Sequence, residues 1–582
     1  MRRFFTLLIP LVLSACSPGA APVTAPAGAL RSIDEAFQNA RRDPNTLRAF
    51  LLEMPKGGDL HHHLTGAVYP EVLIQLASYE GLSVDLTSSA FAQCQGVPAG
   101  SKADIPVSAP TADCKTCADT SSCTTPSTQC VSGTKTLTGS FVPACCLCSD
   151  GSLYDGVVNA LSMRGQPWGT LAAHDHFFAI FGKLGPAVYD AASILAQLRQ
   201  QASRENLLYI ESMSSALKPP GNELTAFQAL FTGGDSSPGV AFCQRLMAGP
   251  LDLASIGDDG KRVLAAADAL GRQTAAAMAG QLAASSKLLG CDANPGAPGC
   301  EVAVRRQIEM HRIFAPAAIC QEALLGFASS HADRPHIVGI NIVAAEDAYV
   351  SRVDYLPHMN LIGNLGSIYP DVGRALHAGE LAEGLVPPND LRFHIAAAVC
   401  TAGAQRIGHG VDITYEADSS PVLLEMAGRQ PSFSCPAHPA ARPVAVEINL
   451  VSNAQLLGVQ GREHPLPLYV GQGVPVVLST DDPGIMRTSL TEQYRLAGLD
   501  YPQLRYADLR TFNRNSLEYS FLTGASIWED SGVYRRPVAA CRAATGGLDL
   551  DRCAGWAQSQ GDKARVQVQL ERRLRVFESR YP

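Results

Sequence analysis

Residues 59–67 of the chain read DLHHHLTGA, and the three consecutive histidines make this stretch the starting point for predicting the fold. Side chains alternate between the two faces of a β-strand, so His61 and His63 would point one way and His62 the other. Two imidazoles on one face of a strand are a common beginning of a zinc site. Taken alone, such a pair is more often solvated or simply hydrogen-bonded, so a metal site needs further ligands.

Further polar groups follow strand-like segments far downstream. His377 and Glu380 stand three residues apart in HAGE, and His409 lies between two glycines in RIGHG, where the backbone can turn tightly. In STDDP, the adjacent carboxylates of Asp481 and Asp482 follow an apolar run. Buried adjacent carboxylates repel each other, which favours a cation or hydrogen-bond donors facing them. Each fragment alone fits a loop or a capping role equally well, and only together do they indicate a site.

Strand-like and helix-like segments alternate over most of the chain. The candidate strands are 206–213, 302–314, 336–343 and 474–478, and the candidate helices are 32–54 (broken at Pro44), 70–80, 187–203, 263–289 and 391–404. Alternating βα units over a long chain predict a parallel sheet with helices outside it.

The bulk composition is that of a globular protein. Of the 582 residues, 46% are hydrophobic and 17% are charged, which is enough apolar material for a large core. The net charge is −8, and no basic run lies outside the N-terminus, so the sequence indicates neither a nucleic acid nor an anionic membrane surface as a partner.

The N-terminus has the features of an export signal. MRRFFTLLIPLVLSAC combines two arginines, a short apolar run and small residues before a cysteine. The last four residues resemble a bacterial lipobox, which implies cleavage before Cys16 and lipid modification of that cysteine; plain secretion is the alternative. We therefore expect 1–15 to be a lipoprotein signal peptide and 16–31 a flexible tether. The protein would be periplasmic or on the cell surface, and bound to the membrane through the lipid only.

The cysteines agree with export. There are 17, and setting Cys16 aside leaves an even number, eight of them within residues 85–150. That segment is rich in Ser, Thr, Gly and Pro, so disulfides are its expected source of order, and a zinc knuckle starting at Cys114 and Cys117 is the alternative. Beyond it we expect local bridges Cys291–Cys300 and Cys541–Cys553, and free thiols in the core at Cys400 and Cys435.

The motifs HHHLTGA, HAGE, RIGHG and STDDP, in this order, resemble the signature of the adenosine deaminase family of zinc hydrolases. The resemblance covers about 54–80, 155–215 and most of 300–525, with supporting segments at 54–56, 446–453 and 464–465. It implies an α/β fold, a TIM-type (β/α)8 barrel within residues 32–582, interrupted by the Cys-rich insertion 85–150 after the first βα unit. Such barrels carry their active sites at the C-terminal ends of the strands.

The resemblance also assigns roles to residues. The ligands of one Zn²⁺ per chain would be His61, His63, His377 and Asp481. The ion would lower the pKa of its water to about 7. The resulting hydroxide would attack C6 of a purine, with His409 beside it as base or electrostatic steer and Glu380 protonating N1.

Four further residues would contact the substrate. Asp482 would hydrogen-bond N7, the backbone at Gly379 would hold the ring, and Gly339 matches a family glycine that approaches the nucleoside. Thr65 stands where many family members have an aspartate that contacts the sugar. This departure leaves the ribose contact and the substrate preference open.

The sequence therefore predicts a zinc-dependent enzyme that converts adenosine or 2′-deoxyadenosine to inosine or 2′-deoxyinosine and ammonia. The alternatives are a deaminase or hydrolase of another 6-substituted purine, and an extracellular nucleoside-binding or signalling protein without turnover. The insertion resembles in its placement that of extracellular adenosine deaminase growth factors. It is either a recognition or homodimerisation element or a passive stabilising flap.

Overall fold

The computed structural model describes residues 27–94, 114–117, 121–124, 126–132, 134–429, 435 and 442–581. The expected signal peptide 1–15 and Cys16 lie outside these ranges. Helix α1 (Ala27–Ala40) begins inside the segment expected to be a tether. Among the described residues, no single helix has the length and apolarity to cross a bilayer, and one pair of helical segments, Leu171–Val188 with Ala191–Arg204, meets these criteria only jointly, across a bend of 114°.

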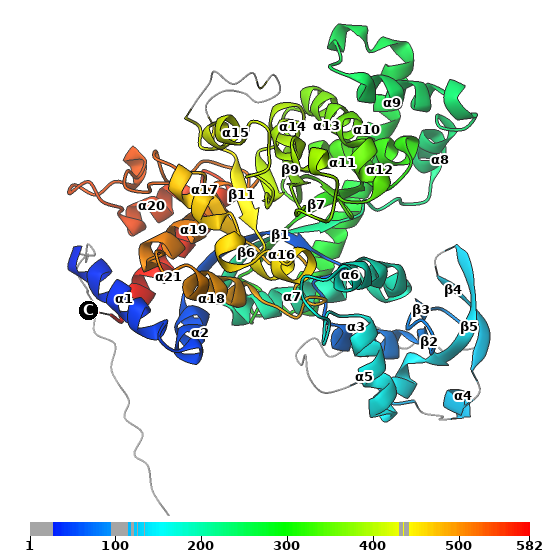
Figure 1. Ribbon diagram of the computed structural model, residues 1–582, viewed down its shortest axis with the longest axis horizontal. Coiled ribbons are helices and arrows are strands. Elements are labelled where there is room, and N and C mark those ends of the chain that lie inside the picture. The colour runs from blue at the N-terminus through cyan, green and yellow to red at the C-terminus, as the bar shows by residue number, and fades with distance from the viewer. Residues whose placement is uncertain are drawn as a thin grey trace, which may run out of the picture.

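A sheet of eight parallel strands forms the centre of the molecule and confirms the predicted (β/α)8 barrel (Figure 1). In sheet order these are β1 (Lys56–His63), β6 (Leu207–Ser214), β7 (Ala303–His311), β8 (Ile337–Val343), β9 (Gly373–Ala378), β10 (Arg406–His409), β11 (Ala445–Ile448) and β12 (Val476–Leu478). The sheet order follows the chain order, because each connection crosses back over the outside of the barrel through helices.

The last strand returns to the first through Asp481. Its backbone N–H donates to the carbonyl of His61 (2.9 Å), and its carbonyl accepts from the N–H of His63 (3.0 Å). The barrel is thus closed at the residues that the motifs singled out.

Helices cover the barrel on its outside and fill its connections. Before the barrel and in its first part lie α1, α2 (Pro44–Glu53), α3 (Pro70–Glu80), α5 (Gly151–Ala160), α6 (Leu171–Leu184) and α7 (Ala191–Arg204). Between β6 and β7 lie α8 (Asn222–Ala229), α9 (Pro238–Ala248) and α10 (Gly257–Leu288). The later connections hold α11 (Pro316–Ala332), α12 (Tyr349–Val353), α13 (Tyr355–Ile368), α14 (His394–Cys400), α15 (Ser419–Met426), α16 (Leu450–Leu457), α17 (Leu466–Gln472) and α18 (Leu490–Asp500). After β12 and α18 come α19 (Tyr506–Glu518), α20 (Leu550–Ala557) and α21 (Asp562–Glu578), and α21 lies beside α1 in Figure 1.

The predicted strands and helices are present, with shifted ends. The helix predicted at 70–80 coincides with α3, and the helix predicted at 32–54 divides at Pro44 into α1 and α2. The helix predicted at 187–203 starts later, at Ala191, because the Asp190 side chain accepts a hydrogen bond from the Ser193 N–H and caps α7 there.

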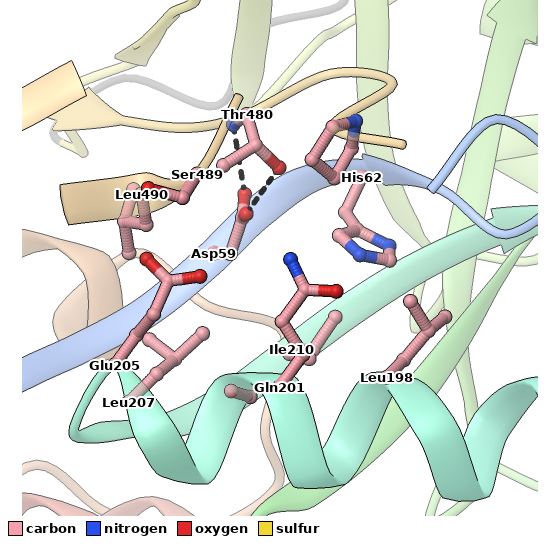
Figure 2. Close-up of a pocket in the computed structure, with 12 residues that line it drawn as sticks. Asp59, His62, Leu198, Gln201, Glu205, Leu207, Ile210, Thr480, Ser489 and Leu490 are labelled. Carbon is pink, nitrogen blue, oxygen red and sulfur yellow. Dashed lines mark hydrogen bonds between the residues drawn. The ribbon is translucent and has the colours of Figure 1, made fainter. Parts of the chain in front are cut away.

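Strand β1 contains a bulge that decides which of its side chains enter the barrel. Its pairing with β6 shifts between Asp59 and His62, so that Leu60 and His61 together oppose one residue of β6. Because of the extra residue, Asp59 and His62 both face outward, where they line one cavity with residues of α7 (Figure 2). His61 and His63 face inward, as strand alternation predicted, and His62 does not.

The Cys-rich insertion is ordered by disulfides. It forms an antiparallel sheet of β3 (Phe91–Ala92), β2 (Ser83–Asp85), β5 (Lys135–Pro143) and β4 (Ser127–Ser132), with the short helix α4 (Ser121–Thr124). The bonded pairs are Cys94–Cys130, Cys114–Cys148, Cys117–Cys145 and Cys123–Cys146. The prediction of disulfides is therefore confirmed, and the alternative of a zinc knuckle is not. In Figure 1 this sheet projects from one edge of the molecule.

Outside the insertion, the disulfides agree with the predicted local bridges but not with the predicted free thiols. Cys291–Cys300 and Cys541–Cys553 are bonded as expected. The expectation of free thiols was wrong, because Cys400, at the end of α14, is bonded to Cys435. Their apolar surroundings suggested core thiols, but the chain after α15 returns beside α14, a tertiary contact with no local sequence signal. A further bridge, Cys243–Cys320, joins α9 to α11.

Candidate active site

The predicted metal ligands meet at the C-terminal end of the barrel. Asp481 Oδ1 lies 3.4 Å from Nε2 of His61 and 3.3 Å from Nε2 of His63. Nε2 of His63 and Nε2 of His377, which comes from β9, are 3.2 Å apart. All four side chains are buried. Residues separated by more than four hundred positions thus share one small volume.

A second set of hydrogen bonds orients the three imidazoles. Each ring uses Nδ1 to contact a buried acceptor oxygen, which places the ring proton on Nδ1 and leaves the Nε2 lone pair facing the common centre. The acceptors are Glu447 for His61 (2.8 Å), Glu309 for His63 (3.1 Å) and Asn341 for His377 (2.8 Å). None of these acceptors lies in the four motifs, so the sequence analysis missed them.

This donor set fits one divalent ion. Ligand atoms about 2.0–2.1 Å from a tetrahedral zinc are about 3.4 Å from one another. Three of the pairwise distances here, 3.2–3.4 Å, match that spacing. Nε2 of His61 is buried and has no hydrogen-bond partner among the described residues. Imidazole and carboxylate ligands suit zinc, and they suit other first-row divalent ions as well.

Glu380 lies beside this cluster, in the turn after β9. Its Oε1 is 3.6 Å from Nε2 of His409. Burial, together with the negative charges of Asp481 and Glu346, raises the pKa of Glu380 well above its usual value. A carboxyl group that keeps its proton at neutral pH is suited to act as a proton donor.

A buried ion pair that the sequence analysis missed supports this turn. Glu346 accepts hydrogen bonds from the N–H groups of Gly379 (3.1 Å) and Glu380 (2.9 Å). Arg312 Nη1 lies 3.4 Å from Glu346, and Arg312 Nη2 donates to the carbonyl of His377 (2.5 Å). The HAGE segment is therefore held by its backbone, which fixes the predicted ligand His377 and the predicted acid Glu380 relative to each other.

Asp482 borders the cluster on the other side. Gly66 leaves room for it, since a Cβ at this position would lie 1.5 Å from Asp482 Oδ1. That oxygen is buried and has no hydrogen-bond partner among the described residues. Burial, with the negative charge of Asp481, raises the pKa of Asp482 well above its usual value. A neutral carboxyl group here can donate a hydrogen bond to a bound molecule.

A cavity of about 350 Å³ opens above the cluster. Its polar floor is formed by His63, His377, Glu309, Glu380, Asp481 and Asp482, and its other lining residues are Thr65, Phe177, Phe178, Phe181, His311, Ile313, Val343, Ala344, Ala345 and Ala348. The three phenylalanines come from α6 and form an aromatic wall. None of these lining residues is Arg or Lys.

The structure corrects one predicted substrate contact. Gly339 does not line the cavity; a Cβ there would meet the carbonyl oxygen of Gly373 at 2.6 Å, and the ring of Phe521, which lies beneath the sheet end opposite the cavity. The end of β8 reaches the cavity farther along, where Ala344 adopts a positive φ of 77°. Thr65 does line the cavity, whereas Gly379 lies next to Glu380 with its N–H held by Glu346.

Part of the chain is similar in sequence to known proteins. Residues 288–526 match the family model for adenosine deaminase. These residues, which make up less than half of the chain, are similar to that family. It is 29% identical over 236 residues to the adenosine deaminase of Shigella boydii serotype 18, a match that covers 40% of this chain, and an adenosine deaminase of Escherichia coli O7:K1 gives the same figures. The chain spans 58% of the length of these curated relatives.

The solved structures that match have lower sequence identity to this chain. An adenine deaminase from Arthrobacter aurescens has 15% identity and a TM-score of 0.41, and covers 81% of this chain and 94% of its own. A zinc-containing amidohydrolase from Burkholderia ambifaria has 16% identity and a TM-score of 0.40, and covers 91% of this chain and 95% of its own.

The hydrogen bond between His63 and Glu309 gives a testable prediction. Glu309→Ala removes the acceptor that fixes the ring, so we expect zinc affinity, measured by competition with a chromogenic chelator, to fall about 10- to 100-fold. Glu322→Ala is the matched control, because Glu322 pairs in the same way with His311, a neighbouring histidine outside the cluster. Unchanged zinc affinity in Glu309→Ala would contradict the ligand assignment of His63.

Proposed function

We propose that this chain is a zinc-dependent purine nucleoside deaminase that hydrolyses adenosine and 2′-deoxyadenosine to inosine and 2′-deoxyinosine with release of ammonia. The observation that carries the proposal is the buried carboxyl group of Glu380, whose pKa is raised well above its usual value by burial and by nearby negative charges, in a cavity that His63 and His377 also line. The similarity of residues 288–526 to the adenosine deaminase family supports the same reaction.

The residues divide the work of this reaction among them. His61, His63, His377 and Asp481 would hold the ion, which when bound supplies a water nucleophile of lowered pKa. Glu380 donates its proton to N1 of the purine, which makes C6 electron-poor at the moment of attack. Asp482 donates a hydrogen bond to N7 and orients the ring. The oxygen of water bonds to C6, and one of its two protons restores that of Glu380. The other proton goes to the amino group, so the C6–N bond breaks, ammonia leaves, and the 6-oxo product keeps the proton on N1.

The charge of the cavity favours a nucleoside over a nucleotide. Four carboxyl groups line it, from Glu309, Glu380, Asp481 and Asp482, and no Arg or Lys is among its lining residues. A phosphate would therefore find no Arg or Lys side chain to pair with, whereas Thr65 offers a neutral hydroxyl group to a sugar.

We also propose that the protein is exported and anchored through a lipid on Cys16. Sixteen of the 17 cysteines form eight disulfides, which supports an oxidising compartment, and Cys16 is the cysteine that remains. The lipobox-like LSAC supports the anchor.

Glu380→Gln tests the reaction. We expect kcat for adenosine, measured by ammonia release, to fall at least about 100-fold, because the amide cannot supply the proton, while zinc content stays at one per chain. Glu383→Gln, in the same loop but exposed, is the matched control and should keep wild-type turnover. Full activity in Glu380→Gln would overturn the assignment of the acid, and a wild-type enzyme inactive on adenosine would overturn the substrate.

The nucleoside preference has its own test. We expect kcat/KM for adenosine to exceed that for AMP by about 100-fold or more, which corresponds to about 2.7 kcal/mol of transition-state binding. The 5′-O-methyl ether of adenosine adds bulk without charge and should be the better substrate of the two modified compounds. Equal kcat/KM for adenosine and AMP would contradict the charge argument.

The anchor predicts the outcome of a labelling experiment. Full-length protein expressed in bacteria should incorporate radiolabelled palmitate and sediment with membranes, and Cys16→Ser should do neither. Release of the wild-type protein as an unlabelled soluble product would show plain secretion instead.

A further inference from the structure

His409 is bonded differently from the other three histidines of the cluster. Its Nδ1 contacts the side-chain nitrogen Nδ2 of Asn453 at 2.9 Å, where the others contact an acceptor oxygen. By distance alone His409 could also be a metal ligand, since it offers a nitrogen within 4.8 Å of ligand atoms of His61, His377 and Asp481. Which of its two ring nitrogens carries the proton decides what it can do.

The position of the ring proton of His464 comes first, and the backbone N–H two residues after His464 determines it. The N–H of Leu466 donates to Nδ1 of His464 at 3.1 Å. A backbone N–H is always a donor, so Nδ1 of His464 bears a lone pair. The ring is then neutral with its proton on Nε2, and burial, which lowers the pKa of His464 to about 3, agrees.

The position of the His464 proton determines which way the side-chain amide of Asn453 is turned. Nε2 of His464 donates to Asn453 Oδ1 at 3.0 Å, which turns Nδ2 of the amide toward His409. An amide nitrogen only donates, so Nδ1 of His409 must accept. A neutral imidazole that accepts at Nδ1 carries its proton on Nε2.

The neighbouring amide of Asn449 is consistent with this assignment. Its Nδ2 is placed 3.5 Å from Nε2 of His409, while its Oδ1 is buried with no partner among the described residues. Turning this amide by 180° exchanges the two atoms, so that an acceptor and not a second donor faces Nε2 of His409 at this distance.

We propose that Asn453 and His464 are positioning residues that hold His409 as its Nε2–H tautomer, so that His409 serves the reaction as a hydrogen-bond donor and is neither a metal ligand nor a base in the resting enzyme. The Nε2–H faces the reacting groups, 3.6 Å from Glu380 Oε1 and 3.8 Å from Asp481 Oδ2. The role in catalysis rests on the proposed function, whereas the tautomer itself does not.

The direct test is the ¹⁵N spectrum of the zinc-loaded full chain labelled at histidine. The His409 signals are identified as those lost in His409→Gln. We expect a pyrrole-type, protonated Nε2 and a pyridine-type Nδ1. A protonated Nδ1 or a metal-bound Nε2 overturns the inference. Because the spectrum needs no turnover, an enzyme inactive on adenosine would overturn the proposed function and leave this result to stand.

Asn453→Asp tests the positioning role with almost no change in shape. The carboxylate would accept from Nδ1–H of His409, so the tautomer reverses and the Nε2 lone pair becomes free to join the ion. We expect kcat to fall about 100-fold, as for loss of a donor at the reacting atoms, with a weaker visible absorbance of the cobalt-substituted protein as the coordination number rises.

Asn449→Asp is the charge-matched control, because it adds the same charge beside the other nitrogen and keeps the Nε2–H. Its cobalt spectrum should remain that of the wild type. A wild-type cobalt spectrum and near-normal kcat in Asn453→Asp would overturn the proposal. If Asn453→Asp does not fold, Asn453→Ala replaces it, and the proposal then requires a mixture of His409 tautomers in the ¹⁵N spectrum; a single Nε2–H form would overturn the positioning role.

Discussion

The structure depends on the pair of backbone hydrogen bonds that joins Asp481 to His61 and His63. These bonds close the barrel between its last and first strands. The same three residues supply a carboxylate and two imidazoles to the candidate metal centre. The barrel is therefore closed, and the site formed, by the same residues. Asp481 adopts a positive φ of 65° to make both contacts, a conformation that costs free energy and is found mainly where surrounding structure enforces it.

The contacts that orient His61 continue as a chain of ion pairs toward the opposite end of the barrel. Glu447, which receives the Nδ1 proton of His61, also pairs with Arg406, and Arg406 pairs in turn with Glu211. All of these side chains are fully buried, and the guanidinium group lies 3.8 Å above the ring of Phe521. Removing one member of a buried ion pair costs about 3–5 kcal/mol, because a charge is left without a partner. The site is therefore rigid because the barrel core beneath it is charged and paired.

Much of this fold could be predicted from sequence, because its signals are local. The alternation of strands and helices, the helix at Pro70, and the inward direction of His61 and His63 all follow from short-range rules. The bonds of Cys400 and the supporting ion pair of Glu346 and Arg312 could not, since each joins distant segments that carry no motif. The substrate contact predicted for Gly339 was wrong because the sequence around a glycine in a strand does not indicate which end of the strand the glycine lies near.

In the proposed metal centre, three imidazoles and one carboxylate bind a single ion through Nε2 and oxygen atoms. X-ray absorption at the zinc K-edge of the purified, metal-loaded protein measures this directly. The account predicts one zinc per chain with only nitrogen and oxygen neighbours at about 2.0–2.1 Å, and a multiple-scattering pattern from three imidazoles. Sulfur in the first coordination sphere, or fewer than two imidazoles, would contradict it.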